Sequence, residues 1–129
     1  MSAVRIEHVA LWTRDLGAQA AFWERHFGAA LGPVYESTNR PGFRSIFATL
    51  PDGPRLELMT GPWVGPAPGG EDEGWAPVAL ALGSDAAVDA KADEMAAEGL
   101  LRSGPRRTGD GYYEAVIAAP GGVTGEIMA

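Results

Sequence analysis

Alternation of apolar and polar residues predicts a strand at the start of the chain. Between Val4 and Trp12 the even-numbered residues would share one face of this strand, and His8 would lie among them. A helix is predicted next, capped by Asp15 and closed by Gly28 in a left-handed conformation. The positions at helical spacing along it are Ala18, Ala21, Phe22, Arg25 and His26.

Three strands and a linker are predicted after this helix. The strands are expected at residues 31–35, 43–50 and 55–60. Residues 61–74 are rich in glycine and proline and end in acidic residues, which indicates a linker rather than a helix or a central strand. Most of it is interpreted as a surface connection, although Trp63 or Trp75 could instead cover a pocket.

The second half of the chain repeats this order of elements. Ser84 and Asp85 can cap a helix over residues 86–98, and Gly99 would end it. The expected buried stripe of this helix consists of Val88, Ala92, Met95 and Ala96. The strands around it are expected at residues 76–82, within 100–107, and at 112–119 and 123–128.

Short motifs also recur after a constant offset of 69 residues, which is the signature of an internal repeat. The matched pairs are His8-Val9-Ala10-Leu11 with Pro77-Val78-Ala79-Leu80, Gly42-Phe43 with Gly111-Tyr112, Pro51-Asp52-Gly53 with Pro120-Gly121-Gly122, and Glu57-Leu58-Met59 with Glu126-Ile127-Met128. The repeat therefore aligns Glu57 with Glu126, and His8 with Pro77.

We expect an α+β fold in which two βαβββ modules follow one another. Module one would span about residues 1–60, the linker 61–74 and module two 75–129, within a single domain over residues 1–129. Each helix would cover one face of a mixed sheet, and the opposite faces would curve around a cleft.

Composition excludes several classes of function. The 129 residues are 46% hydrophobic and 21% charged, as in ordinary soluble domains, and no apolar run approaches the length of a membrane helix. The start of the chain does not resemble a signal peptide and cysteine is absent, so a cytoplasmic location is expected. A net charge of −7 disfavours nucleic acid and anionic membranes but is compatible with a cationic ligand.

The candidate chemical residues are His8, Glu57 and Glu126. A histidine on a strand face is usually packed and hydrogen-bonded, and a carboxylate inside a strand is costly unless it is paired. The arginines that could pair with the two glutamates are Arg44, Arg55 and those near Arg106. Independent ion pairs do not predict matched positions, whereas an inherited cleft does, so the shared offset favours a ligand-binding cleft.

Other polar and aromatic residues are assigned by their position. His26, Arg106 and Arg107 are expected at the surface. Tyr112 and Tyr113 straddle a strand, so one of them would face the cleft.

The chain resembles the vicinal oxygen chelate superfamily, which contains glyoxalases, bleomycin-resistance proteins, extradiol dioxygenases and fosfomycin-resistance enzymes. The resemblance covers nearly the whole chain and is carried by Glu7-His8-Val9-Ala10-Leu11-Trp12, Arg55-Leu56-Glu57-Leu58-Met59, Thr108-Gly109-Asp110-Gly111-Tyr112-Tyr113-Glu114, and Pro120-Gly121-Gly122 with Gly125-Glu126-Ile127. It implies metal-ligand positions at His8, Glu57, Pro77 and Glu126. Pro77 has no donor atom, which leaves a His-Glu-Glu set for Zn²⁺, Ni²⁺, Mn²⁺ or Fe²⁺.

Two functions follow from this resemblance. In the first, a metal-dependent isomerase or lyase acts on a small oxygen-bearing molecule, with Glu126 or Glu57 as the general base. In the second, a metal-independent protein binds or sequesters a cationic or planar ligand. The ligand-binding candidates are Trp12, Trp63, Tyr112 and Tyr113. A homodimer is expected, because short members of the superfamily pair unit one of one chain with unit two of another, and because a monomer would expose apolar strands.

Overall fold

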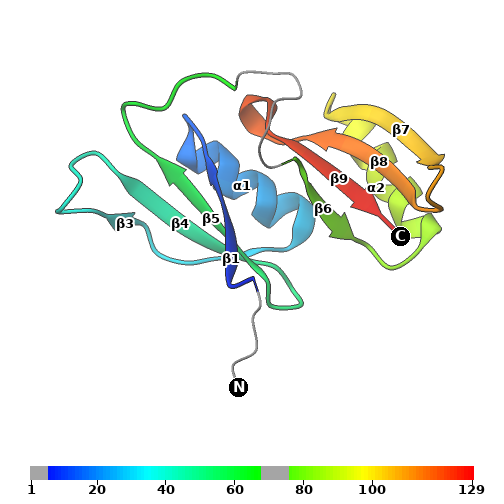
Figure 1. The fold of residues 1–129 in the computed structure, drawn as a ribbon, viewed down its shortest axis with the longest axis horizontal. Coiled ribbons are helices and arrows are strands. Elements are labelled where there is room, and N and C mark those ends of the chain that lie inside the picture. Colours follow the sequence, from blue (N-terminus) through cyan, green and yellow to red (C-terminus); the bar gives the residue numbers. More distant parts are fainter. Residues whose placement is uncertain (1–5, 68–75) are drawn as a thin grey trace. The chain divides into compact units, whose positions relative to one another are not determined.

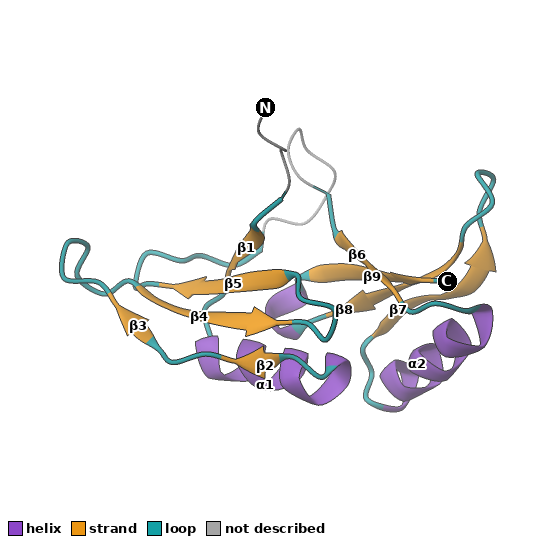
Figure 2. Ribbon diagram, turned by 90° about the horizontal axis from the view of Figure 1, so that it is seen from below, coloured by secondary structure: helices purple, strands orange, loops and turns teal. Residues whose placement is uncertain are grey.

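The structure is a computed structural model that describes residues 6–67 and 76–129. The chain divides into two compact units, Met1–Pro66 and Ala67–Ala129. Each unit contains one sheet and one long helix, and the helix covers a single face of its sheet (Figures 1 and 2). Val4, Trp75 and residues 68–74 of the predicted linker lie outside the described residues.

Unit 1 forms a mixed sheet with strand order β1-β5-β4-β2, in which β3 also pairs with β4. Its elements are β1 (His8–Trp12), α1 (Leu16–Phe27), β2 (Ala30–Leu31), β3 (Tyr35–Glu36), β4 (Arg44–Thr49) and β5 (Arg55–Thr60). The pairing of β1 with β5 is parallel, and the other pairings are antiparallel. One strand was expected at residues 31–35, but two short strands flank Pro33, which cannot donate a backbone hydrogen bond.

Both predicted ends of α1 are confirmed. The side chain of Asp15 accepts a hydrogen bond from the backbone N–H of Ala18 at 2.9 Å, which satisfies one of the free donors of the first turn. Gly28 closes the helix with φ of 66°, a left-handed conformation that glycine adopts without steric cost.

The buried face of α1 differs from the predicted spacing. His26 was expected at the surface, but it is 5% exposed and its ring lies 5.0 Å from that of Phe22, so this prediction was wrong. Ala21 and Arg25 are exposed instead. The reason is that α1 packs against the sheet through a stripe next to the predicted one. The buried residues of this stripe are Leu16, Gln19, Ala20, Phe22, Trp23 and His26.

A chain of buried hydrogen bonds ties α1 to the end of β1. The Gln19 side-chain amide donates to the Thr13 hydroxyl at 3.2 Å, and the Trp23 indole N–H donates to the Gln19 carbonyl at 3.1 Å. Thr13 itself donates its backbone N–H to the carbonyl of Met59 at 2.8 Å. These bonds satisfy polar groups that burial would otherwise leave without water.

Unit 2 repeats the topology of unit 1, with strand order β6-β9-β8-β7. Its elements are β6 (Val78–Ala81), α2 (Asp85–Ala97), β7 (Leu101–Arg107), β8 (Tyr113–Ala118), the short 3₁₀ helix η1 (Pro120–Gly122) and β9 (Thr124–Met128). Ser84 caps α2 through the N–H of Ala87 at 3.1 Å, and β6 pairs with β9 in parallel. The fold is therefore α+β with two βαβββ modules in tandem, as the repeat predicts.

Each sheet has a helix-covered face and an open face. In unit 1, the covered face carries the buried residues Leu56 and Leu58, whereas Glu57 and Met59 alternate with them on the open face. In unit 2, Ile127 is buried beneath α2, and Glu126 points to the open side. Over residues 6–67 and 76–129, no helix is long and apolar enough to cross a membrane.

Candidate functional site

His8 and Glu57 meet on the open face of unit 1. They come from the neighbouring parallel strands β1 and β5, where the register places Ala10 beside Glu57 and His8 beside Arg55. The Nε2 atom of His8 lies 3.3 Å from Oε1 of Glu57. Their side chains are 34% and 19% exposed, respectively, so the pair remains accessible to solvent.

The second ring nitrogen of His8 also faces a carboxylate. Its Nδ1 atom lies 3.5 Å from Oε1 of Glu7, and Glu7 forms an ion pair with Arg55. The Arg55 guanidinium lowers the pKa of the Glu7 carboxyl below its usual value. A carboxylate beside Nδ1 is the arrangement that orients histidine ligands and leaves Nε2 as the donor atom.

Phe47 contacts both His8 and Arg55. Its ring meets the His8 ring edge-on at 5.3 Å, and the guanidinium of Arg55 lies 4.2 Å from the centre of the Phe47 ring. Arg55 is thus engaged by Glu7 and Phe47, and it does not pair with Glu57 as the sequence allowed. Sequence reasoning missed Glu7 and Phe47, although Phe47 could have been found from its alternation with buried residues on the strand that pairs with β5.

Glu126 occupies the equivalent position in unit 2. Its register partners are Ala79 on β6 and Val116 on β8. Partial burial raises the pKa of the Glu126 carboxyl, and the negative charge of the nearby Glu114 raises it further. Glu126 is therefore surrounded differently from Glu57, which faces a histidine.

Pro77 explains this difference, because it stands where the repeat places the counterpart of His8. It lies just before β6, is exposed, and offers no side-chain donor. Within the described part of either unit, no group of three or more His, Cys, Asp or Glu residues is close enough to hold a metal ion. The predicted set is thus divided into a His8–Glu57 pair in unit 1 and Glu126 in unit 2.

The two predicted tryptophans lie together in unit 1. Trp12 ends β1 on the same face as His8, and its ring meets that of Trp63 nearly perpendicularly, with centroids 6.1 Å apart. The ring of Phe43 also meets that of Trp12 edge-on, with centroids 6.0 Å apart. Arg40, which sequence reasoning did not single out, lies over both indoles.

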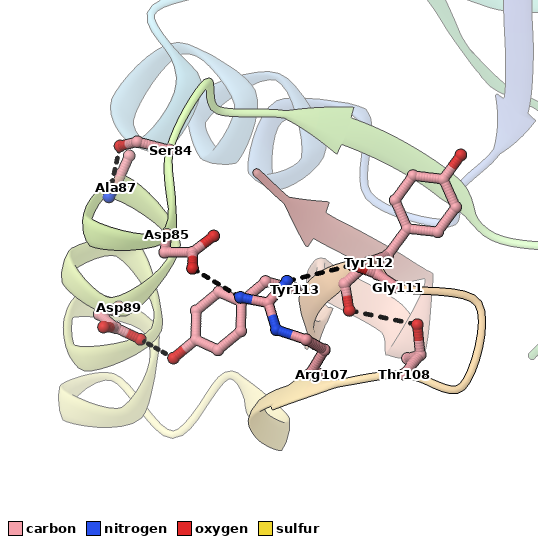
Figure 3. A network of polar contacts seen from close by, with 9 residues as sticks. All are labelled: Ser84, Asp85, Ala87, Asp89, Arg107, Thr108, Gly111, Tyr112 and Tyr113. Atoms are coloured by element: carbon pink, nitrogen blue, oxygen red, sulfur yellow. Dashed lines mark hydrogen bonds and ion pairs between the residues drawn. The ribbon is translucent and has the colours of Figure 1, made fainter.

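The predicted tyrosines point to different sides of β8 (Figure 3). Tyr113 donates its hydroxyl hydrogen bond to Asp89 on α2, which raises the pKa of Tyr113. Arg107 stays exposed, as expected, and donates to Asp85 at 2.8 Å and to the carbonyl of Gly111 at 3.1 Å. The ligand-binding role predicted for Tyr113 therefore does not fit its position on the helix-covered face, whereas Tyr112 is exposed and points away from α2.

Comparison with solved structures finds the same fold in several proteins. A glyoxylase/bleomycin resistance protein/dioxygenase domain from Frankia sp. EAN1pec has a TM-score of 0.84 at 15% identity, with 98% of each chain covered. A possible glyoxalase from Bacillus cereus has a TM-score of 0.71 at 27% identity, covering 98% of this chain and 100% of that one.

A third structure was solved with a metal ion. A mutant of the fosfomycin resistance protein FosX from Listeria monocytogenes, complexed with Mn(II) and 1S,2S-dihydroxypropylphosphonic acid, has a TM-score of 0.73 at 18% identity, covering 99% of this chain and 94% of that one. A comparison with curated proteins found no match. At these identities the Frankia and Listeria structures establish the fold alone.

The sequence itself establishes the family. The model of the Glyoxalase/Bleomycin resistance protein/Dioxygenase superfamily matches residues 5–127, which includes both units and all three of the predicted metal ligands. The two βαβββ modules, the offset between them and this match agree with one another. The chain belongs to the Glyoxalase/Bleomycin resistance protein/Dioxygenase superfamily.

Proposed function

We propose that this chain acts on a small oxygen-bearing molecule at a divalent-metal site, through isomerase or lyase chemistry. The observation that carries the proposal is the His8–Glu57 pair, whose Nε2 and Oε1 atoms lie 3.3 Å apart on an open sheet face. Imidazole and carboxylate together suit Zn²⁺, Ni²⁺, Mn²⁺ and Fe²⁺. The FosX complex with Mn(II) supports a metal in this fold, although it is a property of that protein.

His8 and Glu57 of one chain would hold the metal, and Glu126 of a second copy in the proposed dimer would be the third ligand. When bound, the metal would act as a Lewis acid toward neighbouring oxygens of the substrate. Glu7 would orient the imidazole of His8 through Nδ1, as carboxylates beside histidine ligands do. Glu126 has a raised pKa, so it would accept and return a proton more readily than an ordinary carboxylate.

Metal titration of the purified, untagged protein tests this proposal. After treatment with EDTA and its removal, calorimetry with Mn²⁺, Ni²⁺, Fe²⁺ and Zn²⁺ should show binding that His8→Ala and Glu57→Gln each weaken by at least about tenfold. Glu24→Gln, an exposed carboxylate on α1, is the matched control and should leave binding unchanged. Absence of binding with all four ions would refute the proposal.

The second candidate function is metal-independent binding of a small molecule. Two observations favour it, namely the loss of a donor at Pro77 and the exposure of Trp12 and Trp63, each 42% accessible. Exposed indoles are common contact residues in ligand sites. Ligand binding that persists in EDTA would support this function over the first.

We also propose that the chain is a homodimer. The strands β1 and β6 lie at the edges of their sheets, and edge strands present unpaired backbone groups that a second copy can cover. Light scattering coupled to size exclusion should give about twice the chain mass of 13.5 kDa. A mass equal to that of one chain at micromolar concentration would contradict the dimer.

A further inference from the structure

Arg40 lies over two indole rings in unit 1. Its Cζ atom is 4.0 Å from the centre of the Trp63 ring and 5.7 Å from that of Trp12. We call these three residues the Arg40 cluster. They come from separate segments, namely the end of β1, the turn between β3 and β4, and the segment after β5.

The backbone holds Arg40 and Trp63 in place. The N–H of Arg40 donates to the Ser37 hydroxyl at 3.0 Å, and its carbonyl accepts from the N–H of Phe43 at 3.0 Å. The ring of Trp63 lies directly against Gly61, where any added Cβ would clash with it. A hydrogen-bonded turn therefore fixes the backbone of Arg40. The ring of Trp63 can lie where it does because Gly61 has no side chain.

The guanidinium of Arg40 is available to an anion. Among residues 6–67 and 76–129, no carboxylate pairs with Arg40, whereas Arg55 is paired with Glu7 and Arg107 with Asp85. A guanidinium that stacks on an aromatic ring uses its face, so its N–H edge stays free to bind a carboxylate through two hydrogen bonds. The same stacking occupies indole faces that a cationic ligand would need.

We propose that the Arg40 cluster is a binding subsite for the carboxylate of an apolar or aromatic acid. The edge of the Arg40 guanidinium binds the carboxylate, and the exposed rings of Trp12 and Trp63 contact the apolar body. Each stacked ring adds favourable contact area without requiring a particular functional group on the ligand.

The subsite also narrows the substrate class, and this step rests on the proposed function. Trp12 and His8 lie on one face of β1, four residues apart, which corresponds to about 13 Å along a strand. A molecule that occupies both places carries a carboxylate at one end and its reacting oxygens at the other. The proposed substrate is thus an elongated oxygen-bearing acid with an apolar middle.

Isothermal titration with two probes of equal shape tests the subsite. We choose 4-phenylbutyrate and its neutral amide, 4-phenylbutyramide, at pH 7.5 in EDTA, so that no metal contributes to binding. The acid should bind at least about fivefold more tightly than the amide, because only the acid pairs with the guanidinium. Arg40→Gln should remove this preference, and Arg40→Lys should restore only part of it, since an ammonium lacks the planar fork.

Two further variants separate the subsite from general effects. Gly61→Ala should weaken binding of both probes, because Trp63 must move. Arg102→Gln, an exposed arginine of unit 2, should leave the preference for the acid unchanged. Equal affinity for acid and amide, a preference that survives Arg40→Gln, or no binding of either probe up to its solubility would overturn the proposal.

The outcome is independent of the metal site. If the preference for the acid holds in EDTA while metal titration fails, the subsite stands and the proposed metal chemistry falls. If metal binds and the acid shows no preference, the metal site stands and the subsite falls.

Discussion

The two units share one topology but differ in the candidate site residues that they carry. In unit 1, Glu57 faces His8 across the parallel strands β1 and β5. In unit 2, Glu126 lies beside Ala79 on β6, as Glu57 lies beside Ala10 on β1, but a proline stands at the position that corresponds to His8. The two units therefore repeat one backbone topology without repeating the side-chain donor atoms at equivalent positions. The fold alone does not determine the activity.

The buried cores of the two units are more alike than their open faces. Leu58 and Ile127 occupy equivalent positions, and both are completely buried beneath their helices. Gln19 and Val88 are also equivalent and completely buried, but Gln19 is hydrogen-bonded to Thr13 and Trp23 whereas Val88 packs without polar partners. Unit 1 thus depends on a polar network at a point where unit 2 depends on apolar contact.

The largest expected effect concerns the matched core residues. Leu58→Ala and Ile127→Ala should each lower the free energy of unfolding by about 2–5 kcal/mol, because each leaves a cavity under a helix. Urea denaturation monitored by circular dichroism measures the change. A much smaller loss in one unit would show that its core relaxes around the cavity and that the two cores are not equivalent.

A smaller effect is expected for the polar network of unit 1. Gln19→Met keeps the volume but leaves the buried indole N–H of Trp23 without its acceptor and removes one of the hydrogen bonds of the Thr13 hydroxyl, at a cost of about 1–3 kcal/mol. The same change in a Trp23→Phe background should cost less, because one of the lost partners is already absent. Equal costs in both backgrounds would mean that the bond to Trp23 contributes nothing.

Replacement of the proline makes unit 2 resemble unit 1. Because it adds an imidazole donor, Pro77→His should tighten divalent-metal binding by at least about tenfold, the lower end of the effects typical of changes near a metal site. Pro77→Ala is the control for the loss of the ring and should bind as the unmodified protein does. Identical metal affinities of the two variants in calorimetry would mean that position 77 does not lie at the proposed metal site.

The smallest effect is a pH dependence in unit 2. Burial and Glu114 raise the pKa of Glu126 in the folded protein. The associated stability is fully present below the pKa of the unfolded chain and is lost as pH rises through the folded-state pKa. Glu126→Gln should therefore lose less free energy of unfolding than the unmodified protein as the pH rises above the ordinary pKa of a glutamate. If the free energy of unfolding fell equally with pH in both proteins, Glu126 would not be the cause of the decline. The control Glu24→Gln should show the same pH dependence as the unmodified protein.

Local signals predicted most of the fold. The strand at residues 55–60, the cap at Asp15 and the left-handed Gly28 depend on neighbouring residues alone, and the structure confirms them. The repeat predicted two modules of the same topology, because similar motifs recur at one offset. His26 escaped prediction because alanines on several sides of α1 leave the direction of its buried face undecided by sequence.

The contacts of the candidate site depended on tertiary structure. The sequence indicates Trp12 and Trp63 as separate aromatic residues, and only the tertiary fold brings Arg40, in the turn between β3 and β4, over both rings. Tyr113 could have been placed correctly, since it alternates in phase with the apolar residues Ala115 and Ile117, both of which are buried. Its bond to Asp89 crosses from β8 to α2 and has no local signal.

The parallel pairing of β1 with β5 also affects the order in which the protein can fold. This pairing joins positions 10 and 57, so it closes a longer loop than the hairpin of β4 and β5. Loop closure costs entropy that increases with length, so the hairpin and α1 can form before β1 docks. His8 and Glu57 meet only across the pairing of β1 with β5. The proposed metal binding would therefore report complete folding of unit 1, and an ion bound there would stabilise only the finished sheet.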